Sequence, residues 1–184
     1  MQENILVIHG SFGSPNSNWF PWLYNKLSKA NKNVLIPSFP IGLDFQNYNN
    51  WSKVLAAYKN CGLLNEKTII IAHSIGPIFI LKYLLLNKLK VQKLIFVSGF
   101  NNYLGLSSDY DQVNSSFFLD NLEAAKTCSN EIICIYSKND PYLPVEKLQE
   151  FSATVATTEI VIPEGGHLNN ESGYTKFEEI LDFI

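Results

Sequence analysis

Residues 68–76 form a β-branched apolar run that changes abruptly into His-Ser-Ile-Gly. An uninterrupted apolar run predicts a strand buried on both faces, because neither side of it is polar. Ala72 lies two residues before Ser74, and Gly76 lies two residues after it. Pro77 follows in the predicted first turn of a helix, where a backbone N–H has no partner within the helix and its absence costs nothing. Small residues at these positions let a strand and a helix cross closely, so we predict a sharp strand–turn–helix unit with Ser74 at its tip.

Strand-like and helix-like segments alternate along the whole chain. Strands are predicted at 5–9, 34–37, 68–73, 93–98, 132–137 and 158–162. Amphipathic helical stretches are predicted at 19–30, 48–61, 75–87, 119–129, 145–151 and 175–184, and the two long loops are 37–47 and 99–118. This alternation is typical of a parallel sheet covered by helices on both faces. We therefore predict a single α/β domain over residues 1–184, a three-layer α/β/α sandwich with a mostly parallel sheet of about six strands.

Composition limits the partners of such a domain. The formal net charge is −3 and no Lys/Arg cluster is present, so nucleic acid is not an expected partner. The apolar stretches are shorter than the ~18 residues that span a bilayer, and the first residues lack the basic region of a signal peptide. The three cysteines have no Cys-x-x-Cys spacing, which indicates buried free thiols and a cytoplasmic location.

Three histidines, His9, His73 and His167, lie at the end of a predicted strand or in the loop that follows one. The carboxyl ends of parallel strands lie on one side of an open sheet, so these imidazoles and Ser74 are expected to gather there. A serine becomes a nucleophile when a base that titrates near neutral pH is within reach. We predict His167 as this base, because the preceding Gly-Gly pair gives a flexible backbone that can deliver its ring. His73 is predicted to be structural, because neighbouring side chains diverge in a sharp turn.

A carboxylate is also needed to orient the imidazole and to fix its tautomer. Asp140 directly follows the predicted strand at 132–137, and Pro141 keeps it extended at the strand end. We therefore predict Asp140 for this role. Asp109 and Asp111 are alternatives, although they lie in a polar loop that no strand delivers to the site.

Two backbone N–H groups are predicted to bind the negative oxygen that such a nucleophile creates. One belongs to Ile75, at the N-terminus of a helix whose dipole favours negative charge. The other lies in the His-Gly-Ser-Phe-Gly segment at 9–13, with Ser11 N–H as first choice and Phe12 N–H as second. A donor of this kind contributes roughly 3 kcal/mol to transition-state stabilisation.

Aromatic residues near the strand-following loops are candidate walls of a substrate pocket. We predict Phe12, Phe100 and Tyr142 as substrate-binding residues. Further candidates of the same kind are Trp19, Phe39 and Tyr103. Core packing is the competing interpretation for each of them, and together they suggest a modest apolar acyl or alcohol group.

With Ser74, Asp140 and His167 in that chain order, the sequence resembles a small α/β-hydrolase. More narrowly, it is similar to the compact serine hydrolases grouped with retinoblastoma-binding protein 9 and YdeN. The matching segments are 9–13, 72–76, 137–144 and 165–169, of which Asn-Asp-Pro-Tyr-x-Pro and Gly-Gly-His are the most specific. The resemblance implies a minimal α/β-hydrolase fold with Ser74 as nucleophile, Asp140 as acid and His167 as base. It implies no metal and no organic cofactor.

Two features depart from the family pattern. Ala72 replaces the glycine of the strict turn motif, although alanine is still a small residue. The Leu-x-Cys-x-Glu peptide linked to retinoblastoma-protein binding in the animal member is absent from the chain, so no such partner is predicted.

These residues lead to the hypothesis that the chain hydrolyses a small carboxylic ester, or an amide or thioester, through an acyl-Ser74 intermediate. The alternative is a catalytically weak hydrolase-fold protein that serves as an interaction module, because a fold does not define an activity. A nucleotide- or flavin-binding module built on residues 10–14 is disfavoured. Its glycines do not match Gly-x-Gly-x-x-Gly, and the second predicted strand ends in Pro37-Ser38 without an acid for a ribose.

Overall fold

A single parallel sheet forms the centre of the computed structural model, which describes residues 3–105 and 107–184. Its strands are β1 (Asn4–Ile8), β2 (Asn33–Leu35), β3 (Thr68–His73), β4 (Lys93–Val97), β5 (Ile132–Ser137) and β6 (Thr158–Ile162). Six strands lie in the order β2-β1-β3-β4-β5-β6, and each neighbouring pair is parallel. The predicted strands are confirmed, with ends shifted by a residue or two in β1, β2 and β4.

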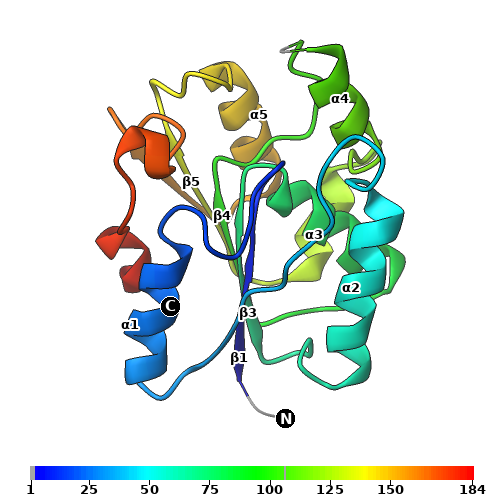
Figure 1. Cartoon of the computed structure of the whole chain (residues 1–184), viewed down its shortest axis with the longest axis vertical. Helices are drawn as coiled ribbons and strands as arrows, with labels where there is room; N and C mark the ends of the chain where they lie inside the picture. Colours follow the sequence, from blue (N-terminus) through cyan, green and yellow to red (C-terminus); the bar gives the residue numbers. More distant parts are fainter. Residues whose placement is uncertain (1–2, 106) are drawn as a thin grey trace.

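Helices cover both faces of this sheet (Figure 1). One face packs against α1 (Phe20–Lys29) and the 3₁₀ segment η3 (Glu178–Phe183). The other packs against α2 (Tyr48–Asn60), α3 (Gly76–Leu86), α5 (Val145–Val155) and the 3₁₀ segment η1 (Glu123–Cys128). Side chains of β1 alternate between these two cores, because successive residues of a strand point to opposite faces. The predicted α/β/α sandwich is therefore confirmed.

The helical predictions differ from the structure in four places. Helix α5 runs about one turn beyond the predicted end at 151, to Val155. The stretch at 119–129 is a 3₁₀ segment only over Glu123–Cys128, and the stretch at 175–184 forms η3 instead of an α-helix. The expected loop at 99–118 contains the helix α4 (Ser108–Ser115). Ser107 caps α4 by accepting a hydrogen bond from Tyr110 N–H, a start signal that the polar composition of this segment concealed.

The carboxyl ends of the strands define the upper edge of the sheet in Figure 1, where β1 runs upward from the N-terminus. The loops that follow β1, β3, β5 and β6 all leave the sheet at this edge, because every strand runs in the same direction. Helix α4 also lies beyond this edge. Residues far apart in the chain are thereby brought to one side of the molecule, as expected for an open parallel sheet.

All three cysteines are free. Cys128 and Cys134 are buried, and burial raises the pKa of their thiols to about 11 and about 12. Cys61 is exposed at the end of α2, so the expectation of a buried thiol is wrong for this residue. A cytoplasmic location stays a prediction. Within the described residues, every helix is too short or too polar to cross a bilayer.

Candidate active site

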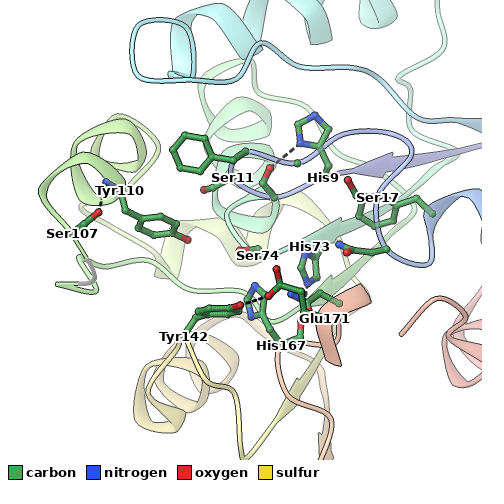
Figure 2. Close-up of a pocket in the computed structure, with 16 residues that line it drawn as sticks. His9, Ser11, Ser17, His73, Ser74, Ser107, Tyr110, Tyr142, His167 and Glu171 are labelled. Carbon is green, nitrogen blue, oxygen red and sulfur yellow. Dashed lines mark hydrogen bonds between the residues drawn. The ribbon is translucent and has the colours of Figure 1, made fainter. Parts of the chain in front are cut away.

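Ser74 occupies the turn between β3 and α3, with a φ of 61°. A positive φ is uncommon for a residue with a side chain and persists only where the surrounding structure enforces it. Here Ser74 N–H donates to Val97 O at 2.9 Å, which ties the turn to β4. The strand–turn–helix unit predicted from residues 68–76 is present, and its tip presents the Ser74 side chain to a cavity (Figure 2).

The loop that follows β1 passes directly beside Ser74. A Cβ placed on Gly10 would lie 2.7 Å from Ser74 Cβ and 3.3 Å from Ser74 Oγ. Only a residue without a side chain allows such a close backbone approach. The backbone that continues into Ser11 therefore borders the Ser74 hydroxyl.

His167 and Asp140 form a hydrogen-bonded pair at the same edge of the sheet. His167 Nδ1 donates to Asp140 Oδ2 at 2.7 Å, and the side chain of Asp140 has 0% exposure. The other carboxylate oxygen, Oδ1, accepts N–H groups from Tyr142 at 2.9 Å and from Leu143 at 3.1 Å. Since Nδ1 carries the proton in this pair, Nε2 of the neutral ring is left as an acceptor.

Ser74 and His167 line the same cavity. Within the described part of the chain, no hydrogen bond joins their two side chains. Serine–histidine hydrogen bonds are often long in a free enzyme and shorten when substrate binds. The structure thus brings together Ser74 and the His167–Asp140 pair, which are distant in sequence. Asp111, an alternative candidate for the acid, instead accepts hydrogen bonds from Leu104 N–H and Gly105 N–H.

The loop that carries His167 is held by side chains from two directions. Asn139 Oδ1 accepts a hydrogen bond from Gly166 N–H at 2.8 Å, and Ser172 Oγ accepts one from His167 N–H at 3.1 Å. Gly166 has a φ of 55°, and a Cβ at this position would collide with Ser172. The Gly-Gly pair therefore serves a tightly packed turn, so our expectation that it supplies flexibility is wrong.

His73 is buried directly behind His167. Its Nε2 donates to His167 O at 2.9 Å, and the two ring centroids are 4.8 Å apart. Burial, followed by the nearby charge of His167, lowers the pKa of His73 to about 3. His73 is therefore neutral at physiological pH and supports the backbone that carries His167, which agrees with its predicted structural role.

Ser11 and Ile75 approach Ser74 from the β1 loop and from α3. The N–H of Phe12 is already engaged, because it donates to Gln46 Oε1 at 2.8 Å. Among residues 3–105 and 107–184, the N–H groups of Ser11 and Ile75 have no protein acceptor. Of the two candidates in the β1 loop, only Ser11 N–H is thus available to another group.

These residues line a cavity of about 560 Å³, in which many lining residues carry polar groups but apolar atoms make up the larger part of the exposed wall. Glu171 is the one acidic side chain in the described lining, which contains neither Lys nor Arg. The hydroxyl of Tyr142 donates to the Glu171 carboxylate, and the Tyr142 ring lies edge-on to His167 at 5.3 Å. Within the described residues, no group of three or more His, Cys, Asp or Glu side chains forms a metal site.

The predicted substrate-binding aromatics divide into two groups. Phe12 and Tyr142 line the cavity. Phe100 does not, because it is 0% exposed and packs in the core against Phe118 with ring centroids 6.3 Å apart. The prediction for Phe100 is wrong, since burial against the helical layer removes its ring from the strand edge. The other candidates, none of which lines the cavity in the described structure, are Trp19, Phe39 and Tyr103.

Several polar residues at or behind the cavity were not predicted from the sequence, among them Tyr110, Gln46 and Asn114. Tyr110 of α4 lines the cavity, and Gln46 and Asn114 are buried behind it with 1% exposure each. The helix start at Ser107 was a usable signal for Tyr110. Gln46 and Asn114 meet across two separate segments, and no local pattern indicates such a pairing.

Comparison with known proteins identifies the fold and the family of this chain. The crystal structure of the ydeN gene product from B. subtilis superposes with a TM-score of 0.86 at 24% identity, covering 100% of this chain and 96% of that one. The fold is thus the minimal α/β-hydrolase fold. The sequence model of the family described as serine hydrolase matches residues 5–184, and the chain belongs to this family.

Two curated relatives agree with this assignment. YdeN of Bacillus subtilis (strain 168) is 26% identical over 186 residues, which cover 100% of this chain and 95% of YdeN. The serine hydrolase RBBP9 of Rattus norvegicus is 32% identical over 122 residues, which cover 65% of this chain and 61% of RBBP9. Membership in this family supports hydrolase activity.

Proposed function

We propose that the chain hydrolyses small carboxylic esters through an acyl-enzyme formed on Ser74. The observation that carries this proposal is the buried 2.7 Å hydrogen bond from His167 to Asp140, because the His167 ring lines the same cavity as the strained Ser74. Asp140 holds the tautomer in which His167 Nε2 is free to accept a proton. A serine hydroxyl is a weak nucleophile until such a base removes its proton.

In the acylation step, His167 Nε2 takes the proton of Ser74 while Oγ attacks the ester carbonyl carbon. The resulting tetrahedral intermediate collapses, the bond to the alcohol oxygen breaks, and His167 returns the proton to the leaving alcohol. Water then attacks the acyl-enzyme, with His167 again as base, and the acid is released as Ser74 regains its proton. Asp140 stays ionised throughout and stabilises the imidazolium.

The negative oxygen of the tetrahedral intermediate is bound by Ser11 N–H and Ile75 N–H in this proposal. This assignment is supported by Phe12 N–H, the other candidate donor in the β1 loop, which already donates to Gln46 Oε1. Ile75 precedes α3 directly, so the helix dipole also favours negative charge at this point.

The cavity supports a short substrate with both apolar and hydrogen-bonding parts. Our expectation of an apolar acyl or alcohol group had rested on six aromatic residues, of which only Phe12 and Tyr142 reach the cavity. Serine, asparagine and glutamate side chains make up much of the remaining lining. A short acyl group that combines apolar carbons with a hydrogen-bonding substituent therefore fits this mixed lining.

Hydrolysis of p-nitrophenyl acetate and labelling by a fluorophosphonate test this function directly. Ser74→Ala is expected to abolish both, because it removes the atom that becomes acylated. Asp140→Asn is expected to lower kcat about 10³- to 10⁴-fold, since the tautomer of His167 is no longer enforced. His167→Ala is expected to lower kcat by a similar or larger factor.

Ser28→Ala provides a matched control, because Ser28 is an exposed residue of α1 outside the cavity. It should be labelled and should turn over like the wild type. Equal labelling of wild type and Ser74→Ala would contradict the proposal and would favour an interaction module with the hydrolase fold.

A further inference from the structure

Helix α4 places Tyr110 across the cavity from Ser74. Figure 2 shows the Tyr110 ring pointing into the cavity from α4, with its hydroxyl directed toward the Ser74 side. The side chains of Ser11, Ser74 and Asn114 lie near enough to this hydroxyl to lower its pKa, against the larger effect of burial, but in the described structure no hydrogen bond joins it to any of the three. The phenol therefore faces Ser11 and Ser74, which border the proposed reacting atoms, although α4 was absent from the predicted elements.

Tyr110 is held on both sides along α4. Ser107 Oγ accepts the Tyr110 N–H at 3.1 Å, which fixes the start of the helix. The Asp111 carboxylate accepts two backbone N–H groups of the preceding segment at 3.0 Å each. One turn after Tyr110, Asn114 is buried with 1% exposure. A side chain supported in this way keeps its position when substrate binds.

A chain of hydrogen bonds sets the direction of the donors around Tyr110. Phe12 N–H can only donate, so the oxygen of Gln46 must face it at 2.8 Å. Gln46 Nε2 then donates to Asn114 Oδ1 at 3.0 Å, which orients the Asn114 amide. The Ser11 hydroxyl therefore donates to Asn114 Oδ1 at 2.7 Å. With the Ser11 proton committed, the Tyr110 O–H is the available donor between Ser11 and Ser74.

Burial supports this donor role, because it raises the pKa of Tyr110 and keeps the phenol protonated at neutral pH. The ring also packs beside Phe12, with centroids 6.4 Å apart and planes inclined by 44°. The phenol is thus anchored next to the loop that supplies Ser11 N–H. A donor held in place before the reaction needs no reorganisation when negative charge develops.

We propose that Tyr110 is a catalytic residue whose hydroxyl donates a hydrogen bond to the negative oxygen of the tetrahedral intermediate, beside Ser11 N–H and Ile75 N–H. The inference rests on the proposed acyl-Ser74 chemistry. The intermediate is attached to Ser74 Oγ, and its negative oxygen points toward the Ser11 backbone. The Tyr110 hydroxyl borders the same space and keeps its proton throughout the reaction.

Tyr110→Phe tests this role, because it retains the ring and removes only the hydroxyl. Turnover of p-nitrophenyl acetate should fall about 100-fold in kcat with KM changed less than about 3-fold, as for the loss of one oxyanion donor. Trifluoroacetophenone forms a tetrahedral adduct with a serine, so its inhibition constant should rise by the same factor as kcat/KM falls. Acetophenone, which forms no stable adduct, should bind equally to both proteins.

Tyr103→Phe is the matched control, because Tyr103 is 59% exposed and lies outside the described cavity lining. It should leave all of these constants unchanged. Replacing Tyr110 by 3-fluorotyrosine keeps the donor and the ring, and should restore kcat to near the wild-type value.

Three outcomes would overturn the inference. A Tyr110→Phe kcat within about 3-fold of wild type would show that the hydroxyl is not a transition-state donor. A raised KM with an unchanged inhibition constant for trifluoroacetophenone would identify Tyr110 as a ground-state contact only. In both cases the wild type still turns over and Ser74 is still labelled, so the proposed function survives. A wild type without turnover or labelling would overturn the proposed function and the role of Tyr110 together.

Discussion

Substitution of Gly10 by alanine is expected to disable the site by displacing Ser74. The added Cβ would lie 2.7 Å from Ser74 Cβ, whereas non-bonded carbon atoms approach to about 3.5–4.0 Å. Either the backbone segment at Gly10 or the segment at Ser74 must therefore move by about 1 Å. Ser74 has little freedom to move, because its φ of 61° is set by the turn and its N–H is bonded to Val97.

The magnitude follows from two separate effects of this displacement. Inserting a methyl group into a packed site costs about 1–3 kcal/mol in the free energy of unfolding. A misplacement of about 1 Å at a reacting centre lowers the rate about 100-fold. Gly10→Ala should thus lower kcat/KM for p-nitrophenyl acetate about 100-fold, and should slow fluorophosphonate labelling by a similar factor. Urea denaturation measures the accompanying loss of stability.

Gly62→Ala separates lost stability from lost activity. Gly62 has a φ of 74° and open space around its Cβ position, so alanine is strained there but touches nothing. This variant should lose about 1–2 kcal/mol of stability and retain wild-type kcat/KM. If Gly10→Ala kept activity within about 3-fold of wild type at unchanged stability, the close packing of Gly10 against Ser74 would be refuted.

Two further predictions concern a buried histidine and the charge of the cavity. Burial lowers the pKa of His73 from 6.5 to about 3. Between these two pH values the unfolded chain binds more protons at this residue than the folded chain does, so the free energy of unfolding falls as the pH drops. At pH 5 the expected loss is about 2 kcal/mol. In His73→Gln, which keeps an amide donor for His167 O, urea denaturation at pH 7.5 and pH 5 should give a smaller difference, and an unchanged difference would contradict this assignment. Glu171→Gln should reduce the preference for acetylthiocholine over its neutral isostere 3,3-dimethylbutyl thioacetate about 2- to 5-fold, because it removes the carboxylate that lines the cavity. Glu66→Gln is the control, because Glu66 is exposed and lies outside the cavity lining, and it should leave the ratio of the two kcat/KM values unchanged. An unchanged ratio in Glu171→Gln would show that the Glu171 carboxylate does not act on the substrate.

The strand–turn–helix unit at Ser74 was predictable because its causes are local. A β-branched run, small residues on both sides of Ser74 and a proline in the first helical turn act through sterics over a few neighbours. The strand positions were predictable for the same reason. Once all strands run parallel, residues that follow them must share one edge, which is why Ser74, Asp140 and His167 could be placed together before their contacts were known.

Other parts of the site depend on which segments meet in space. Phe100 follows a strand as Asp140 does, yet its ring is drawn into the core, because apolar surface is removed from water wherever a neighbouring layer can cover it. The aromatic residues of the loops were therefore poor guides to the cavity lining, which only Phe12 and Tyr142 of the six reach in the described structure.

The chain's own pattern was sufficient for the sheet, the turn at Ser74 and the polar residues at the strand ends, because these follow from periodicity and from short-range sterics. The folded molecule was needed to show that Gln46 reaches Asn114 and that α4 turns Tyr110 toward Ser74. Hydrogen bonds between segments separated by tens of residues leave no periodic trace, since each partner is chosen by packing. The arrangement of hydrogen-bond donors around Ser74 is therefore a property of the assembled layers.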